Sequence, residues 1–335
     1  MMRKPWKLML FLVMASAAAT AGATDTADNV VIAVHGGAGG LPADLTPEGE
    51  AAYKRGLRAA LEAGGKVLRE GGDSMDAVIA AVTVLEDDPL FNAGRGAVLN
   101  CMGEAELDAS VMDGASGRGG AVAAVRHVRN PARLAHAVME HTGHVMLAGR
   151  GAFEFALERG LPVAPQDYFR TPQRMARVTP VADCAQPPAL VEGGGTVGAI
   201  ARDARGHLAA ATSTGGRSGK RVGRVGDSPI LGAGTWADER VAISGTGHGE
   251  YFMRGLTAYD IAARMHYRGQ PLTEAVRGTM QATLAERGGS GGVIALNRDG
   301  GLVVGFNTRT IKRGWLTADG EIVVGIRSEP LAAGQ

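Results

Sequence analysis

The sequence predicts an α+β protein in which two mainly antiparallel β-sheets pack together beneath covering helices. Helix-period and strand-period segments occur on both sides of residue 196, and hairpin patterns dominate the part that follows it. The chain has 335 residues and 45% hydrophobic side chains, enough for a substantial core. Two packed sheets covered by helices would bury this much apolar sequence.

The N-terminus has the pattern of a secretory signal peptide. Three basic residues precede an apolar run over 8–19, and Ala-Gly-Ala at 21–23 supplies the small residues of a signal-peptidase site. We expect removal of residues 1–23 and a secreted protein, which would be periplasmic in a Gram-negative bacterium. The apolar run is shorter than a helix needs to cross a bilayer, so no membrane partner is expected once residues 1–23 are removed.

Composition and spacing argue against several kinds of site. A formal net charge of +1 disfavours nucleic acid as the main partner. The only two cysteines, Cys101 and Cys184, do not make a disulfide framework, and we expect unpaired thiols. His136, His141 and His144 lack the spacing of a zinc site on one helix, which favours structural roles.

The part before residue 161 mixes strands and helices. An apolar strand at 30–34 leads into HGGAGG at 35–40, which fits an oxyanion loop and a plain tight turn equally well. A helix over 47–70 has an apolar face, and Asp73 or Ser74 is expected to cap the next helix. The remaining elements expected here are a helix at 75–85, strands at 105–112 and 120–128, and helices at 131–140 and 145–159.

Residues 161–195 differ in composition from the segments on either side. They carry six prolines and no clear period, which predicts a flexible linker. From residue 196 the pattern is mainly β, with two helices. The expected elements are strands at 196–202, 207–214, 241–244, 292–297, 302–307 and 321–326 and helices at 258–267 and 272–287.

Three glycines at 193–195 bring this linker to Thr196, where the first of those strands begins. A threonine at such a boundary is suited to self-cleavage, because the freed α-amino group can act as base for the hydroxyl of its own residue. That amine has an ordinary pKa of about 7.7–8.0, so a neutral fraction exists near pH 7. A flexible hinge before an edge strand is the alternative. The G-x-G-x-x-G match at 193–198 lacks the preceding strand and following helix of a dinucleotide site.

Two further motifs have structural interpretations on the residues alone. The loop at 86–96 could turn backbone carbonyls toward a small cation, but on the residues alone a surface turn is favoured. The G-x-S-x-G match at 288–292 follows a helix and precedes a strand, the reverse of a serine-hydrolase elbow. A helix C-cap and turn are therefore expected there.

Eight motifs span essentially the whole mature chain: HGGAGG (35–40), LEDDPLFNAGRGAVL (85–99), ELDASVMDG (106–114), GGGTVGAIA (193–201), ATSTGG (211–216), GRVGDSPILGAG (223–234), SGTGHGE (244–250) and GGVIALNRDG (291–300). Together they resemble the plant-type L-asparaginase/isoaspartyl peptidase family of N-terminal nucleophile hydrolases. The resemblance implies a four-layer αββα sandwich in which an α chain (24–195) and a β chain (196–335) form one domain. It also implies a dimer of αβ heterodimers.

The resemblance implies a cut at the Gly195–Thr196 bond and Thr196 as the nucleophile. Thr214 matches the family threonine that holds the hydroxyl and amine of the nucleophile. Thr246 and Gly247 match the oxyanion pair, where hydrogen-bond donors stabilise the charge that develops on the substrate oxygen.

Arg224 and Asp227 match the family residues that bind the α-carboxylate and α-amino group of the substrate. The planar guanidinium suits a carboxylate, and the carboxylate of aspartate suits an ammonium group. Gly249 and Asn92 correspond to residues beside the substrate. A structural sodium ion is implied, with no cofactor for catalysis; the residues that match the sodium loop are Leu85, Glu86, Asp88, Phe91, Ala93 and Arg95.

The implied activity is that of an autoproteolytically activated threonine amidohydrolase, which releases L-aspartate from β-aspartyl (isoaspartyl) dipeptides and L-asparagine. A glycosylasparaginase of the same fold and a non-catalytic periplasmic amino-acid binding protein are the alternatives. Departures from the family pattern occur at Arg217 and Lys220, which make their loop more basic, and at His248. These residues could alter the substrate preference.

Overall fold

The computed structural model describes residues 23–42, 44–178, 184 and 195–328. Residues 1–22 of the predicted signal peptide lie outside this part of the chain, as do Gly193, Gly194 and most of the predicted linker after residue 178. Among the described residues, none of the helices combines the length and the hydrophobicity that a bilayer-crossing helix needs.

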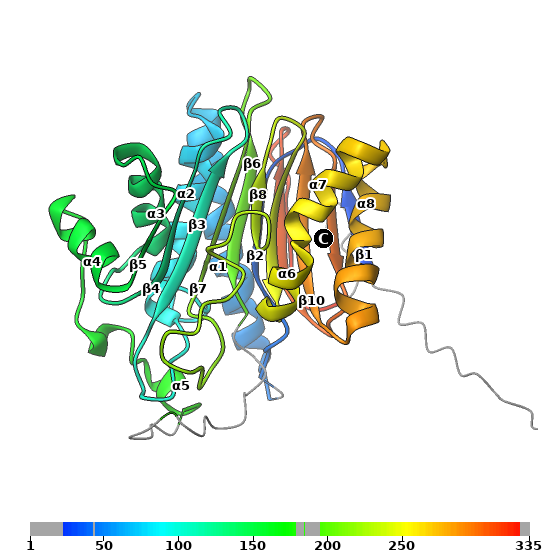
Figure 1. Ribbon diagram of the computed structural model, residues 1–335. Coiled ribbons are helices and arrows are strands. Elements are labelled where there is room, and N and C mark those ends of the chain that lie inside the picture. The colour runs from blue at the N-terminus through cyan, green and yellow to red at the C-terminus, as the bar shows by residue number, and fades with distance from the viewer. Residues whose placement is uncertain (1–22, 43, 179–183, 185–194, 329–335) are drawn as a thin grey trace, which may run out of the picture.

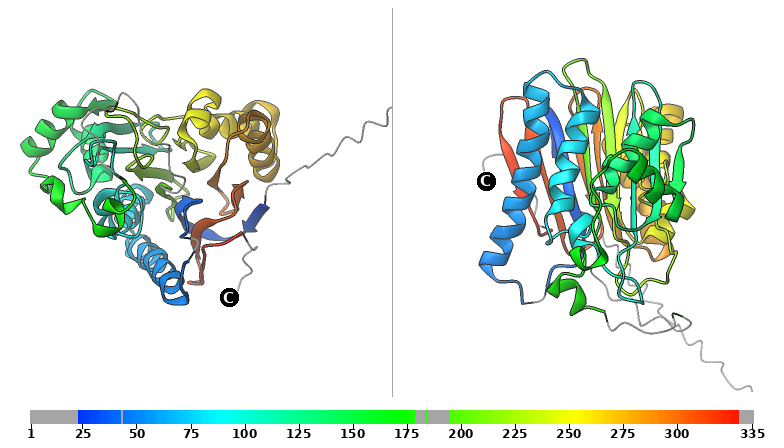
Figure 2. Two further views of the ribbon diagram at one scale, coloured as in Figure 1. Left: turned by 90° about the horizontal axis from the view of Figure 1, so that it is seen from below. Right: turned by 90° about the vertical axis from the view of Figure 1, so that its left-hand side faces the viewer.

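Two β-sheets stack face to face, and helices cover the outer face of each, which confirms the predicted αββα sandwich (Figures 1 and 2). One sheet has eight strands in the order β13-β12-β2-β6-β7-β3-β4-β5, in which only β4 and β5 are paired parallel. Their bounds are β2 Val30–Ala38, β3 Leu107–Asp113, β4 Gly119–Val125, β5 Met146–Ala148, β6 Val197–Arg202, β7 Leu208–Thr214, β12 Ile311–Thr317 and β13 Ile322–Gly325.

The second sheet is fully antiparallel, in the order β1-β11-β10-β9-β8. Its strands are β1 Ala23–Ala27, β8 Thr235–Ala237, β9 Val241–Gly247, β10 Gly291–Asn297 and β11 Leu302–Phe306. Apolar side chains of both sheets, such as Ile200, Ala210 and Ile294, form the layer between them. Because several of these residues are alanines, the two sheets can approach each other closely.

Helices α1 to α4 cover the eight-stranded sheet, and α6 to α8 cover the five-stranded one (Figure 1). The helices are α1 Pro47–Arg69, α2 Ser74–Asp87, α3 Pro131–His141, α4 Gly149–Glu158, α5 Pro172–Met175, α6 Gly249–Gly255, α7 Thr257–Arg268 and α8 Leu272–Thr279. Short 3₁₀ or π turns occur at η1 Gly94–Gly96, η2 Gln166–Tyr168, η3 Met280–Leu284 and η4 Ala285–Arg287.

Local sequence signals set the start of the two long helices. The Thr46 hydroxyl accepts a hydrogen bond from the Gly49 backbone N–H, and Pro47 occupies the first turn of α1. Asp73 caps α2, because its Oδ1 accepts from the Asp76 N–H at 2.8 Å. Of the two expected capping residues, Asp73 is therefore the one that acts.

Several elements differ from the sequence-based predictions. The helix expected over 145–159 begins only at Gly149, since β5 precedes it. The helix expected over 272–287 changes into the π and 3₁₀ turns η3 and η4 after residue 279. Strands β1, β8 and β12 and helices α5 and α6 were not predicted, and α5 lies within the segment predicted to be a flexible linker. In β12 the apolar alternation is broken by Arg313, which is fully buried and pairs with Asp25 of β1 at 2.6 Å.

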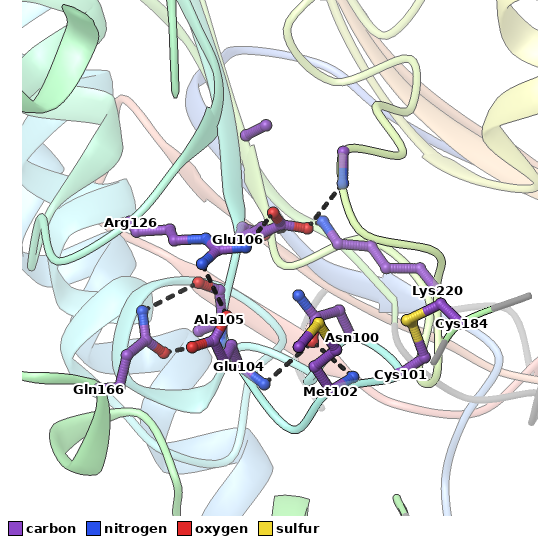
Figure 3. A network of polar contacts seen from close by, with 12 residues as sticks. Asn100, Cys101, Met102, Glu104, Ala105, Glu106, Arg126, Gln166, Cys184 and Lys220 are labelled. Carbon is purple, nitrogen blue, oxygen red and sulfur yellow. Dashed lines mark hydrogen bonds and ion pairs between the residues drawn. A yellow bond between two sulfur atoms is a disulfide. The ribbon is translucent and has the colours of Figure 1, made fainter. Parts of the chain in front are cut away.

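The expectation of unpaired thiols is wrong: Cys101 and Cys184 form a disulfide, with a Cα–Cα distance of 5.8 Å (Figure 3). The pairing joins residues 83 positions apart. Cys184 belongs to the predicted linker, and Cys101 lies in the turn that precedes β3 in the chain. The fold brings the two together, which sequence spacing alone did not indicate.

Residues from both sides of Gly195 are interleaved in the eight-stranded sheet. Strands β6 and β7 lie between β2 and β3, and all these pairings are antiparallel. A cut before Thr196 would therefore leave the two pieces joined by the hydrogen bonds of adjacent strands.

Antiparallel pairing also gathers strand ends at one place. The start of β6 lies beside the ends of β2 and β7, and the start of β3 pairs with the end of β7. In the facing sheet, the end of β9 pairs with the start of β10. The candidate site is built where these ends meet.

Candidate active site

A pocket of about 500 Å³ opens at these strand ends. Thr196, at the beginning of β6, lies in its wall together with Thr214 from the end of β7. Its lining also includes Arg224, Asp227 and Gly247, so the structure brings the principal predicted site residues together. The volume lies in the range of about 300–1,000 Å³ typical of small-molecule sites.

The predicted nucleophile is nearly buried and tightly held. Thr196 is 6% exposed, and its Oγ1 donates a hydrogen bond to Oγ1 of Thr214 at 3.2 Å. The Thr196 carbonyl oxygen accepts from Nδ1 of His35 at 3.0 Å. Both ends of the residue are thus fixed, and its hydroxyl stays at the pocket wall.

The carbonyl group of Gly195, on the predicted cleavage bond, has donors aimed at it. Nδ2 of Asn92 donates to this oxygen at 2.6 Å, and Oγ1 of Thr214 donates at 3.4 Å. The Asn92 amide is oriented in turn, because its Oδ1 accepts from the Val98 N–H at 2.7 Å. Asn92 therefore presents its amide donors to the bond before Thr196.

Gly37 allows the close approach of β2 to this bond. A Cβ atom at Gly37 would lie 2.6 Å from the Gly195 Cα and 2.8 Å from the Thr196 nitrogen. Its φ of +103° is also one that side-chain-bearing residues avoid. The segment 35–40 is thus packed directly against the predicted cleavage bond, beyond the role of a plain turn.

A chain of buried hydroxyl groups crosses between the sheets behind Thr196. Burial lowers the pKa of His35 to about 3, so the ring is neutral and one nitrogen donates while the other accepts. Since Nδ1 must donate to the Thr196 carbonyl, Nε2 accepts from Oγ of Ser244 at 2.9 Å. Ser244 then accepts from Thr212 at 2.6 Å. Sequence reasoning did not assign this role to His35, although the HGG motif marked the position.

Arg224 and Asp227 are predicted to bind the α-carboxylate and α-amino group of the substrate, and we call them the headgroup clamp. The structure adds a third residue to this clamp, Glu250. Glu250 Oε1 accepts from Nε of Arg224 at 3.1 Å and from Nη2 at 2.8 Å. This two-point contact fixes the guanidinium plane. Glu250 was not predicted as a site residue, although it is the last residue of the SGTGHGE motif (244–250).

Asp227 lies beside Arg224 in the pocket wall and is 4% exposed. Burial raises its pKa to about 7, against the opposing effect of the Arg224 charge. Within the described residues its buried Oδ2 has no hydrogen-bond partner. An unsatisfied acceptor of this kind suits a cationic ligand. Gly249 permits the close packing, since a Cβ there would lie 2.7 Å from Oδ1 of Asp227.

The predicted oxyanion pair lies at the end of β9. Oγ1 of Thr246 accepts from the Ala38 N–H at 3.0 Å, which leaves the Thr246 hydroxyl hydrogen free to donate elsewhere. Gly247 lines the pocket, and a Cβ there would lie 2.5 Å from the Gly291 Cα. Only glycine can occupy position 247, because β9 and β10 approach each other so closely there.

The residues predicted to hold sodium span the last turn of α2 and the loop that follows it, and they are separate from the pocket lining. Asn92 does not line the pocket either, but its amide reaches the Gly195 carbonyl. The residues predicted to hold sodium, none of which lines the pocket, are Leu85, Glu86, Asp88, Phe91, Ala93 and Arg95. The carbonyl oxygens of Pro89 and Phe91 both lie against Gly96, so close that a Cβ there would clash with them. The backbone of this loop is thus tightly wound, with carbonyl groups near one another.

Glu86 acts through its side chain rather than as part of the pocket. Its Oε1 accepts from Oγ of Ser213 at 2.7 Å and from the Ala132 N–H at 2.9 Å. Burial raises the pKa of Glu86 to about 7. The side chain therefore ties the loop to β7 and α3.

The three residues that depart from the family pattern have different surroundings. Lys220 is 1% exposed and donates from Nζ to the Glu106 carbonyl at 2.8 Å, in the network that includes Arg126 (Figure 3). It supports the loop rather than lining the pocket. Arg217 and His248 both line the pocket, and Arg217 lies 3.8 Å from Glu250.

The motifs interpreted as structural agree with the structure. Gly288, with φ of +76°, is the C-cap of η4, as expected for the segment 288–292. In the part of the chain that the structure describes, no group of three or more histidine, cysteine, aspartate or glutamate side chains could hold a metal ion. His136 and His141 lie on α3, and His144 follows that helix.

Comparison with known proteins gives consistent matches. The family model described as Asparaginase matches residues 28–326. The isoaspartyl peptidase of Salmonella typhimurium is 45% identical over 313 residues, covering 90% of this chain and 100% of that protein. The isoaspartyl peptidase/L-asparaginase of Xenopus laevis is 41% identical, covering 88% and 94%, respectively. A probable isoaspartyl peptidase/L-asparaginase of Arabidopsis thaliana is 38% identical, covering 88% and 98%.

Proposed function

This chain belongs to the asparaginase family whose model matches residues 28–326, and on that basis we propose that it hydrolyses β-aspartyl dipeptides and L-asparagine, releasing L-aspartate. The observation that carries the proposal is one pocket that holds both Thr196 and the Arg224–Asp227 pair. The charged pair suits a free amino-acid headgroup, which an ordinary internal peptide residue lacks. The hydroxyl of Thr196 lies in the same pocket to act on the side chain of that headgroup.

In the proposed turnover, the Thr196 hydroxyl attacks the side-chain amide carbonyl of the substrate. The free α-amino group of Thr196 takes the hydroxyl proton and then gives it to the leaving nitrogen. Ammonia or an amino acid departs, and an ester to Thr196 remains. Water hydrolyses that ester to release aspartate. Nucleophile and base belong to one residue, so this sequence of steps needs no cofactor.

Thr246 and Gly247 are proposed to stabilise the negative charge that develops on the substrate oxygen. The Thr246 hydroxyl is suited to this role because the Ala38 N–H already occupies an acceptor position on its oxygen. A donor of this kind typically contributes about 3–4 kcal/mol to the transition state. Thr214 would keep the nucleophile oriented through the 3.2 Å contact between their Oγ1 atoms.

Maturation is proposed to use the same hydroxyl. Oγ of Thr196 would attack the Gly195 carbonyl, the C–N bond would break as the nitrogen takes a proton, and water would hydrolyse the resulting ester. Asn92 and Thr214 support this step, since both donate to the carbonyl oxygen on which charge would form. The positive φ of Gly195, +71°, suits a residue without a side chain.

A structural sodium ion is proposed for the loop between Leu85 and Arg95. Hard oxygen ligands suit such a cation, and the crowding of the Pro89 and Phe91 carbonyls around Gly96 supports a carbonyl-rich loop. The ion would brace the loop that carries Asn92. We further propose export with removal of residues 1–23 and assembly as a dimer of αβ heterodimers. Fractionation of cells and light scattering of the purified protein test these two points.

The central experiment combines intact-mass analysis with activity assays. We expect a fragment that begins at Thr196, together with hydrolysis of β-aspartyl dipeptides and asparagine. Thr196→Ala should remain one inactive chain. Cleavage of that variant at the same bond, or full activity of an uncut chain, contradicts the proposal. Faster hydrolysis of glycosylated asparagine would indicate a glycosylasparaginase, and binding without turnover an amino-acid binding protein.

A further inference from the structure

The pocket continues beyond the headgroup clamp to a second set of polar residues. Thr308, Arg309 and Thr310, from the connection between β11 and β12, belong to its lining, as does Leu41. The Gly39 N–H donates to the Thr310 carbonyl at 2.7 Å, so the loop after β2 joins this end of the pocket. None of these residues has a role in the proposed chemistry.

Contacts along the wall place the oxyanion residues between the two ends. Gly249 packs against Asp227 of the clamp, and it is separated from Gly247 by one residue. On its other side, Gly247 pairs with Gly291, whose carbonyl accepts from the Asn307 N–H at 3.0 Å. Asn307 leads directly into Thr308. The wall therefore runs from the clamp, past the oxyanion residues, to the 308–310 segment.

The order of these residues along the wall determines the direction in which the leaving group extends. When the clamp holds the aspartyl headgroup and the oxyanion residues hold the reacting carbonyl, the leaving part of the substrate must extend toward Arg309. Ammonia from asparagine is too small to reach that end. The second residue of a β-aspartyl dipeptide is long enough, and it carries a free α-carboxylate.

Charge pairing distinguishes Arg309 from the other arginines of the pocket. Arg217 and Arg224 both pair with Glu250, at 3.8 and 2.8 Å. No carboxylate of the described residues lies within ion-pair distance of Arg309, whose side chain is exposed at the pocket rim. An unpaired guanidinium with two threonine neighbours is suited to a carboxylate.

We propose that Arg309, with Thr308 and Thr310, forms the leaving-group subsite and binds the free α-carboxylate of the second residue of β-aspartyl dipeptides. The proposal rests on the proposed function and specifies its preferred substrate class. It makes this chain a dipeptidase that prefers a free C-terminus, in which asparagine uses only the clamp half of the pocket.

The test compares three substrates on the mature enzyme: β-aspartyl-leucine, the same dipeptide with an amidated C-terminus, and L-asparagine. We expect the wild-type enzyme to prefer the free acid over the amide by about fivefold in kcat/KM, the upper range of an exposed ion pair. This preference should decrease at high ionic strength. Arg309→Gln should abolish it, mainly through KM, and Arg309→Glu should reverse it. Arg58→Gln, at an exposed arginine on α1, is the matched control.

Equal hydrolysis of the acid and the amide by the wild-type enzyme overturns the subsite. So does an Arg309→Gln variant that loses the same factor on all three substrates, since a structural role would act on each alike. If the wild-type enzyme hydrolyses none of the three, the proposed function itself fails. The failure of the subsite and the failure of the function are therefore distinguishable.

Discussion

The side-chain amide of Asn92 donates to the carbonyl oxygen of Gly195 at 2.6 Å. The two residues are 103 positions apart, and the contact places a hydrogen-bond donor on the bond expected to break during maturation. The same amide also donates to the Gly216 carbonyl at 2.8 Å. After a cut, Asn92 would still lie beside Thr214, whose Oγ1 is 3.4 Å from its Nδ2.

Asn92→Ala is expected to slow self-cleavage by about 10²-fold, the effect of removing one oxyanion donor. A time course of the uncut chain on a denaturing gel measures this rate. Gln281→Ala, at an exposed amide on η3, should mature at the wild-type rate. Normal maturation of Asn92→Ala would show that the contact has no part in bond cleavage.

Glu250→Gln should raise the KM for asparagine by about three- to tenfold with a smaller effect on kcat. Glu250 accepts two hydrogen bonds from Arg224, and loss of its charge frees the guanidinium to move. Its partly exposed position keeps the expected effect moderate. Steady-state kinetics provide the measurement, with Glu62→Gln on the exposed side of α1 as control. A selective loss of kcat would instead point to a role in the chemical step.

Burial raises the pKa of Asp227 to about 7, which predicts a pH dependence of substrate binding. Above that pKa the carboxylate is charged and can pair with the substrate ammonium, whereas below it the group is neutral. The kcat/KM should therefore fall as pH decreases through about 7. Asp227→Asn should have low kcat/KM and lack this part of the profile. The remaining dependence would report the amine of Thr196, whose ordinary pKa is about 7.7–8.0. An unchanged profile in Asp227→Asn excludes Asp227 as its source.

Reduction of the Cys101–Cys184 disulfide is expected to lower the free energy of unfolding by about 2–4 kcal/mol. The bond closes a loop of 83 residues, which restricts the unfolded chain. Urea unfolding with and without a reducing agent measures the difference. A Cys101→Ser/Cys184→Ser double variant should have the same free energy of unfolding as the reduced protein, with or without the reducing agent. Two titratable thiols in the untreated protein would contradict the pairing.

The amino-acid sequence by itself determined the features that depend on neighbours along the chain. Thr46 and Asp73 cap their helices through contacts three residues ahead, and the position of Thr196 before a strand is visible in the local pattern. The αββα sandwich followed from the order of strand and helix patterns together with the family motifs. Such signals are short in range, so a linear reading detects them.

Only the tertiary structure decided the contacts that join distant segments. Ser244 is 209 residues from His35, and no local pattern indicates that its hydroxyl bonds to that ring. The burial of Arg313 against Asp25 likewise depends on β1 and β12 meeting in the folded protein. Burial and long-range hydrogen bonds arise when strands from both halves of the chain pack together, which is why the support of Thr196 became visible only in three dimensions.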